Sequence, residues 1–173
     1  MLVVSKGQPY ESRPVSLVFT TGNDWFQTLI ELHTGSSATH VAIGIGNQLL
    51  HSHEDGVVLE PRSYWFGKRK QKLIAEFQIL VDVDDGIRGV LRHVGKGFGV
   101  AHVLKAGLLR KLTPWVRSLG PDSTDRLSCT QLVAMIDPHG EHIPEWRYLW
   151  REGLAPVDLL EVAAWSPRFR RIA

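Results

Sequence analysis

The chain has 173 residues, is 43% hydrophobic, and carries a formal net charge of +2 from 20 basic and 18 acidic side chains. These values predict one globular domain over residues 1–173, and the balanced charge argues against nucleic-acid binding as the main role. The single cysteine, Cys129, excludes an internal disulfide and favours a reducing compartment. Residues 1–11 do not resemble a signal peptide, and no apolar run is long enough for a membrane span. We therefore expect a soluble, cytoplasmic protein.

Hydrophobic periodicity and turn residues define the predicted elements. Apolar runs bounded by Gly, Pro or polar turns predict strands, whereas apolar residues spaced three and four apart after a capping residue predict helices. In chain order we predict a strand over 15–19, a helix over 24–35, strands over 39–45, 48–53, 56–60 and 73–83, and helices over 84–95, 128–136, 145–151 and 156–163. This succession indicates an α+β fold with a central antiparallel sheet packed against helices.

Three further segments are basic. We interpret residues 68–72 as a solvated loop and residues 167–171 as a solvated tail or an edge strand. Residues 100–119 combine a leucine stripe with lysine and arginine, a pattern typical of an ordinary surface helix and also of a helix that touches a membrane surface. Peripheral membrane contact through 100–119 is therefore one of the expectations.

The predicted hairpin over residues 39–53 brings histidines together. The two-residue turn at 46–47 sets a register in which His40 pairs with His53 and Ala42 pairs with His51. Directly paired residues share a face, so all three histidines should line the side that the small residues leave open. His51 is then the diagonal neighbour of His40, close enough for contact between the two rings.

Cys129 is predicted to be the first residue of a helix. Ser128 and Gln131 have the spacing of a capping box, which places the thiol at the helix N-terminus. Unpaired backbone N–H groups and the helix dipole favour a thiolate there. A cysteine on an apolar helix face is also commonly an inert core residue, so the presence of a base decides between the two interpretations.

A cysteine hydrolase requires a thiolate, a base, and a polar group that orients the base. The chain supplies these in the order histidine first and cysteine last, with His-Val-Ala-Ile-Gly-Ile-Gly at 40–46, Leu-Leu-His-Ser at 49–52 and Ser-Cys-Thr-Gln-Leu-Val at 128–133. This succession resembles the circularly permuted NlpC-like branch of the papain-like superfamily. That branch includes lecithin:retinol acyltransferase-like proteins and bacterial YiiX-like hydrolases.

The resemblance implies a permuted papain-like fold and a role for each residue. Cys129 would be the nucleophile, His40 the general base and His51 the orienting residue. Relatives usually carry their second histidine one residue later, but the shorter hairpin turn here makes us prefer His51 to His53. Many relatives also carry an aromatic residue before the cysteine, where this chain has Ser128.

The implied activity is hydrolysis of an amide or ester, or acyl transfer, through a covalent acyl-enzyme, with a peptide or a lipid-acyl substrate and no cofactor. The six tryptophans and the leucine stripe favour an apolar substrate, whereas the missing anchor favours a small peptide.

Two other classes of function fit the same residues. The chain could retain the fold as a non-catalytic binding or structural module, in which case Cys129 is buried and unreactive. Alternatively, His40, His51 and His53 could bind a metal ion together with Asp55. The single cysteine and the lack of a second ligand cluster make a closed metal site hard to assemble, so we expect no resident metal.

Overall fold

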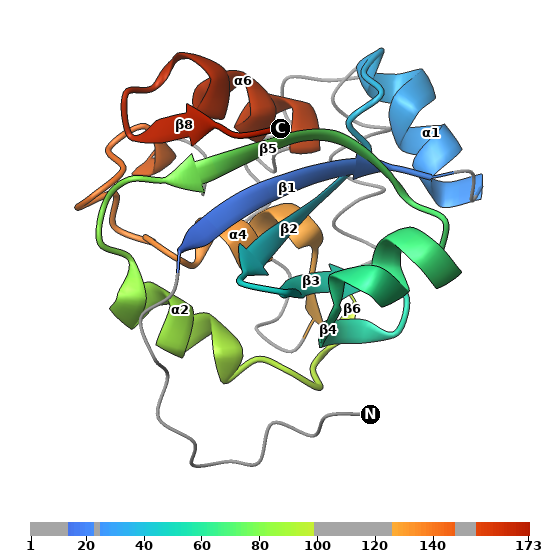
Figure 1. Cartoon of the computed structure of the whole chain (residues 1–173), viewed down its shortest axis with the longest axis horizontal. Coiled ribbons are helices and arrows are strands. Elements are labelled where there is room, and N and C mark those ends of the chain that lie inside the picture. The colour runs from blue at the N-terminus through green and yellow to red at the C-terminus, as the bar shows by residue number, and fades with distance from the viewer. Residues whose placement is uncertain (1–13, 23–24, 99–125, 148–154) are drawn as a thin grey trace, which may run out of the picture.

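The structure, a computed structural model, describes residues 14–22, 25–98, 126–147 and 155–173 (Figure 1). Its centre is a six-stranded sheet in which all neighbouring strands run antiparallel. The order across the sheet is β4 (Gly56–Pro61), β3 (Gln48–His53), β2 (His40–Ile45), β1 (Val15–Thr21), β5 (Lys72–Ile79) and β8 (Phe169–Arg171). The predicted α+β class and central antiparallel sheet are therefore confirmed.

Helices and one small sheet surround the central sheet. The short parallel pair lies outside it and consists of β6 (Gly97–Phe98) and β7 (Arg126–Leu127). Within the described residues the helices are α1 (Trp25–Thr34), the π-helix η1 (Tyr64–Lys68), α2 (Asp84–Leu91), α4 (Cys129–Ala134) and α6 (Pro156–Trp165). Figure 1 shows α4 behind β2 and α6 beside β8, and the contacts between these elements agree with that placement.

The two faces of the sheet bury different sets of side chains because successive strand residues point to opposite sides. One face carries the main core, in which α2, α4 and α6 pack against β1, β2 and β5. Leu17 and Ile43 belong to this core and are fully buried. The other face carries a smaller buried cluster of Val18, Ala42, Leu49 and Trp65. Both faces of the central strands are therefore covered.

Next to its turn the hairpin of β2 and β3 has the predicted register, but the pairing ends at Ile43 and Leu50, and the predicted pairs Ala42–His51 and His40–His53 are not part of the described ladder. Ile45 pairs with Gln48, Gly44 with Leu49, and the turn between the strands contains Gly46 with φ of +56°. A positive φ is costly for residues with a side chain and free for glycine, which is why Gly46 can begin this tight turn.

The segment after β4 differs from the prediction. Residues 68–72 were expected to form a solvated loop, but η1 ends at Lys68, β5 begins at Lys72, and the Arg69 side chain packs inward with 20% exposure. The sheet edge at β8 agrees with the edge-strand interpretation of 167–171, and β5 ends at Ile79, earlier than predicted. The predicted helix over 100–119 and residues 148–151 of the helix over 145–151 lie outside the described residues.

None of the helices in the described part of the chain combines the length and apolarity needed to cross a bilayer. The cytoplasmic location and the membrane contact through 100–119 stay predictions.

Candidate functional site

The histidines that were predicted to meet on the hairpin are neighbours in the structure. His40 begins β2, and His51 and His53 lie in the second half of β3. The ring centroids of His40 and His51 are 5.2 Å apart with their planes at 90°, and those of His40 and His53 are 6.2 Å apart. The predicted ring contact between His40 and its diagonal neighbour His51 is therefore confirmed.

Trp65 from η1 covers this histidine cluster. Its ring centroid lies 4.2 Å from that of His51 and 5.1 Å from that of His40. His51 is 0% exposed and His40 is 5% exposed, so the expectation of an open side was wrong. The small side chain of Ala42 makes room for the indole, which fills the space that the sequence pattern left empty.

Several polar atoms in this cluster are buried without a hydrogen-bond partner among the described residues. They include His40 Nε2, His51 Nδ1 and Trp65 Nε1. Buried polar groups in native proteins are almost always paired, and those left unpaired are found preferentially at functional sites or beside a bound water. The cluster is therefore chemically unusual as well as buried.

Two charged residues that sequence analysis did not single out complete the cluster. Glu60 on β4 accepts a hydrogen bond at Oε1 from His51 Nε2 at 3.0 Å. Arg69 places Nε 3.6 Å from the same carboxylate oxygen and Nη1 3.3 Å from His53 Nδ1. Glu60 could have been predicted from the register of the hairpin formed by β3 and β4. That register pairs Glu60 with Leu49 and so places it diagonal to His51. Arg69 carried no such signal.

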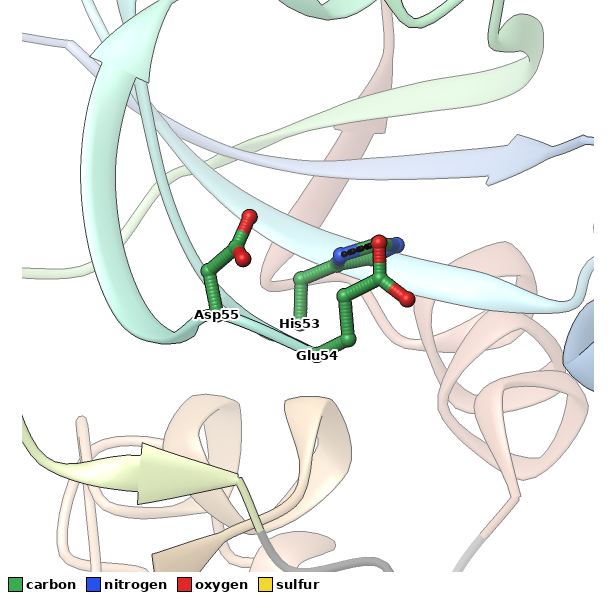
Figure 2. Close-up of side chains that lie close together, drawn as sticks. All are labelled: His53, Glu54 and Asp55. Carbon is green, nitrogen blue, oxygen red and sulfur yellow. Dashed lines mark ion pairs between the residues drawn. The ribbon is translucent and has the colours of Figure 1, made fainter.

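The turn after β3 holds a small group of potential cation ligands. His53, Glu54 and Asp55 each offer one ligand atom within 4.8 Å of the others, and Figure 2 shows the Glu54 carboxylate beside the His53 ring. Arg69 already binds this group, with Nη2 2.5 Å from Asp55 Oδ2, and its positive charge opposes a metal ion there. The predicted alternative set of three histidines with Asp55 does not assemble within the described residues.

Cys129 occupies the predicted position as the first residue of α4. Ser128 is the N-cap, its Oγ accepts a hydrogen bond from Gln131 N at 3.2 Å, and Gln131 Oε1 accepts one from Ser128 N at 2.9 Å. The capping box is thus confirmed. The cysteine side chain is 6% exposed and packs in the main core beside Val41.

The electrostatics of the thiol differ from the expectation. Burial raises the pKa of Cys129 to about 11, although backbone N–H groups of Val41, Thr130 and Cys129 itself act to lower it. The helix N-terminus therefore favours the thiolate, but the loss of water outweighs that effect and the resting group is a neutral thiol. Of the two interpretations that the sequence left open, the pKa of Cys129 favours the neutral core thiol at rest.

His40 and His51 are also neutral near pH 7. Burial is the largest cause that lowers the pKa of His40 well below 6.5, and the neighbouring His51, His53 and Arg69 lower it further. Burial likewise lowers the pKa of His51, partly offset by its hydrogen bond to Glu60. A neutral imidazole can accept a proton, so His40 retains the capacity to act as a base.

The relation between His40 and Cys129 is indirect. The backbone N–H of Val41, the residue after His40, is directed at the Cys129 sulfur. His40 Nε2 has no hydrogen-bond partner among the described residues, so this atom is not bonded to the thiol. The structure brings the strand of His40 to the helix start of Cys129, and Nε2 of the imidazole is not bonded to the thiol.

No known protein family matches the sequence, and no curated protein matches it. Among solved structures, the chain is similar to the metalloprotein yiiX from Escherichia coli O157:H7, DUF1105, at 14% identity. That likeness covers 95% of this chain and 98% of the other, with a TM-score of 0.47. A YiiX protein is thus a structural neighbour, but at this TM-score the likeness does not assign a family, and the NlpC-like branch finds no match.

Proposed function

We propose that the protein is a thiol hydrolase that acts on an amide or ester through a covalent acyl-enzyme on Cys129. His40 is the base and His51 orients it. The S–H bond of Cys129 breaks as its sulfur bonds to the substrate carbonyl carbon, and His40 takes the proton and passes it to the leaving amine or alcohol. Water then cleaves the thioester, which releases the acid and restores the thiol.

The observation that carries the proposal is the junction between β2 and α4. The N–H of Val41 is directed at the Cys129 sulfur, and His40 is the residue immediately before Val41. On the other side, the His40 ring contacts that of His51 at 5.2 Å. The three residues on which the sequence motifs converge thus lie on adjoining segments of one small region.

The protonation states define the kind of catalysis that this site supports. With a buried neutral thiol and a buried neutral imidazole, the pair does not hold a preformed ion pair. His40 therefore removes the proton while the sulfur attacks, as a general base. For this step the unprotonated ring nitrogen of His40 must come within hydrogen-bond distance of the thiol, while its other ring nitrogen keeps the N–H.

The test uses 4-nitrophenyl acetate as an activated ester and intact-protein mass spectrometry to detect acetylated Cys129. We expect nitrophenol release and the acetyl-enzyme in the wild type and in His139→Ala, which changes an exposed histidine outside the cluster. Cys129→Ser should abolish the thioester. His40→Ala should slow its formation by about 100-fold or more, the usual contribution of a general base. Acylation at the wild-type rate in His40→Ala would exclude the hydrolase mechanism.

A second candidate is a non-catalytic module that keeps the fold. The burial of Cys129 and its pKa of about 11 favour this candidate, because they describe an unreactive core thiol. It predicts that Cys129 is acetylated only after unfolding, and that His40→Ala changes stability alone. The same ester experiment, repeated with and without denaturant, separates the two functions.

A further inference from the structure

We propose that Glu60 is a positioning residue that holds His51 in the tautomer protonated on Nε2, so that Nδ1 remains an acceptor beside the ring of His40. The catalytic meaning of this assignment rests on the proposed function. Its structural content, the control of the His51 tautomer by Glu60, can be measured independently of any activity.

The sheet register places the two residues together. Glu60 on β4 pairs with Leu49 on β3, and His51 lies two residues further along β3 on the same face. The contact is short and enclosed, with His51 Nε2 3.0 Å from Glu60 Oε1 and side-chain exposures of 0% and 15%. Arg69 holds the carboxylate from another direction, with Nε 3.6 Å from the same oxygen.

The chemistry of this contact fixes the proton on His51. An ionised carboxylate only accepts hydrogen bonds, so the nitrogen that faces it must carry the proton. A neutral imidazole has one N–H, which leaves Nδ1 of His51 with a lone pair and no proton. If the proton were on Nδ1 instead, Nε2 of His51 and the carboxylate oxygen of Glu60 would face each other as two acceptors. Their repulsion would destabilise the folded state, and more strongly because the contact is buried.

Unpaired atoms near His51 indicate which groups could donate a hydrogen bond to its Nδ1. His51 Nδ1 and His40 Nε2 are both buried without a partner among the described residues, in rings 5.2 Å apart. A hydrogen bond from His40 to His51 Nδ1 would satisfy both residues at once and would orient the base. The indole Nε1 of Trp65 is also unpaired among the described residues. It is a second group that could donate a hydrogen bond to His51 Nδ1.

The experiment compares Glu60→Gln with Glu54→Gln in the full chain labelled with ¹⁵N-histidine. The glutamine amide can either donate or accept a hydrogen bond. Glu60→Gln therefore removes the requirement for a proton on His51 Nε2 while it keeps the shape of the side chain. Glu54→Gln is the matched control. Within the described residues Glu54 lies 3.8 Å from both His53 and Arg69 and makes no ion pair with His51, and its side chain is 74% exposed. Ring nitrogen shifts report the tautomer, and unchanged His139 and His142 signals report that the fold is kept.

We expect His51 to carry its proton on Nε2 in the wild type and in Glu54→Gln, and to become a mixture of tautomers in Glu60→Gln. Formation of the acetyl-enzyme from 4-nitrophenyl acetate should slow about tenfold in Glu60→Gln, as is typical when a residue that orients a functional histidine is lost. A wild-type proton on Nδ1, or a Glu60→Gln protein with the wild-type tautomer and acylation rate, would overturn the proposal.

The two proposals fail in different ways. If Glu60→Gln changes the His51 tautomer while His40→Ala acylates as fast as the wild type, the hydrolase function falls and the hold of Glu60 on His51 stands. If His40→Ala slows acylation while Glu60→Gln changes neither tautomer nor rate, the hydrolase stands and the role of Glu60 falls.

Discussion

The thiol of Cys129 faces the backbone N–H of Val41, and so the start of one helix meets the start of one strand in a buried contact. N–H groups around the sulfur stabilise a thiolate, whereas burial opposes any charge. Burial dominates here, because the pKa of Cys129 rises to about 11. The contact therefore holds a thiol that is protonated at rest and has hydrogen-bond donors that would stabilise the charge of its thiolate.

The first prediction concerns the alkylation of this thiol. In the native protein, the rate with iodoacetamide should keep rising with pH until about pH 11, because only the thiolate reacts. In denaturant the same cysteine should titrate near its ordinary pKa of 9.0, so unfolding should raise the rate near pH 8 by about 100-fold. Stopped-time alkylation with mass spectrometry measures both rates.

Cys129 is the single cysteine of the chain, so the signal has one source. Cys129→Ser provides the blank for reaction at other side chains. A native thiol that alkylates fastest at neutral pH would contradict the prediction and would indicate a thiolate–histidine ion pair instead.

The sequence predicted the positions of the site residues better than their environment. Strict alternation and a glycine turn were enough to place His40 beside His51, because strand register follows from local geometry. The covering side chain, Trp65, was not predictable, since it comes from a π-helix that has no periodic signature. The burial that raises the Cys129 pKa depends on this kind of tertiary packing, which is why the sequence alone left the charge state of the thiol open.

Gly44 shows the same limit at a single position. Its lack of a side chain was interpreted as space on an open side of the sheet. In the structure a Cβ at Gly44 would collide with the guanidinium of Arg62 and the hydroxyl of Ser16. The glycine is needed because a distant arginine crosses the strand, and no local pattern in the sequence indicates that crossing.

The second prediction is a loss of stability below about pH 6.5. Burial lowers the pKa of His40 and His51 in the folded state, whereas the unfolded chain binds protons near pH 6.5. Between the two pKa values the unfolded state holds more protons, so the free energy of unfolding falls as pH falls. Each histidine that stays neutral in the fold contributes a loss of up to about 1.4 kcal/mol per pH unit.

Urea unfolding at about pH 7.5 and about pH 5.5 measures this effect, and the range is separate from carboxylate titration. The hydrogen bond from Arg69 is the chief cause that lowers the pKa of Asp55. Its contribution to the free energy of unfolding is therefore complete above about pH 3.8 and is lost only below that pH. The matched control is His139→Ala, which changes an exposed histidine outside the cluster. A free energy of unfolding that is constant across the two conditions would refute the prediction.

The third prediction concerns the ion pair between Arg62 and Glu76. The guanidinium contacts both carboxylate oxygens, at 2.6 and 2.9 Å, and donates to the carbonyl of Gly46 at 3.0 Å. Burial acts to raise the pKa of Glu76, but hydrogen bonds from Arg62 and Ser16 outweigh it and the pKa lies below the ordinary value. The pair is only partly buried, so Arg62→Met should cost about 1–3 kcal/mol, between the values for an exposed and a buried pair.

The matched control for this pair is exposed. Arg88 and Asp85 form an ion pair whose side chains are 53% and 98% exposed, and Arg88→Met should cost about 0.5 kcal/mol or less. Urea unfolding of both variants gives the comparison. Equal losses in Arg62→Met and Arg88→Met would show that the partly buried pair of Arg62 and Glu76 stabilises the fold no more than the exposed pair does.

The fourth prediction compares two glycines of α2, the helix that packs beside the end of α4. A Cβ at Gly86 would run into the backbone carbonyl of Ile136, whereas a Cβ at Gly89 meets nothing within 4 Å. Backbone cannot move aside as a side-chain tip can, so Gly86→Ala should destabilise the protein by about 1–3 kcal/mol, as overpacking does. Gly89→Ala should stabilise it by about 0.5–1 kcal/mol, because alanine costs less entropy in a helix.

Thermal melting of the two variants checks the opposite signs in one helix. The close approach at Gly86 holds α2 against the chain that follows α4, so its loss should also loosen the helix whose first residue is Cys129. We therefore expect Gly86→Ala, and not Gly89→Ala, to speed native-state alkylation of Cys129, because the thiol reacts with reagent that reaches it through local opening. Equal alkylation rates in the two variants would show that the packing of α2 does not control access to the thiol.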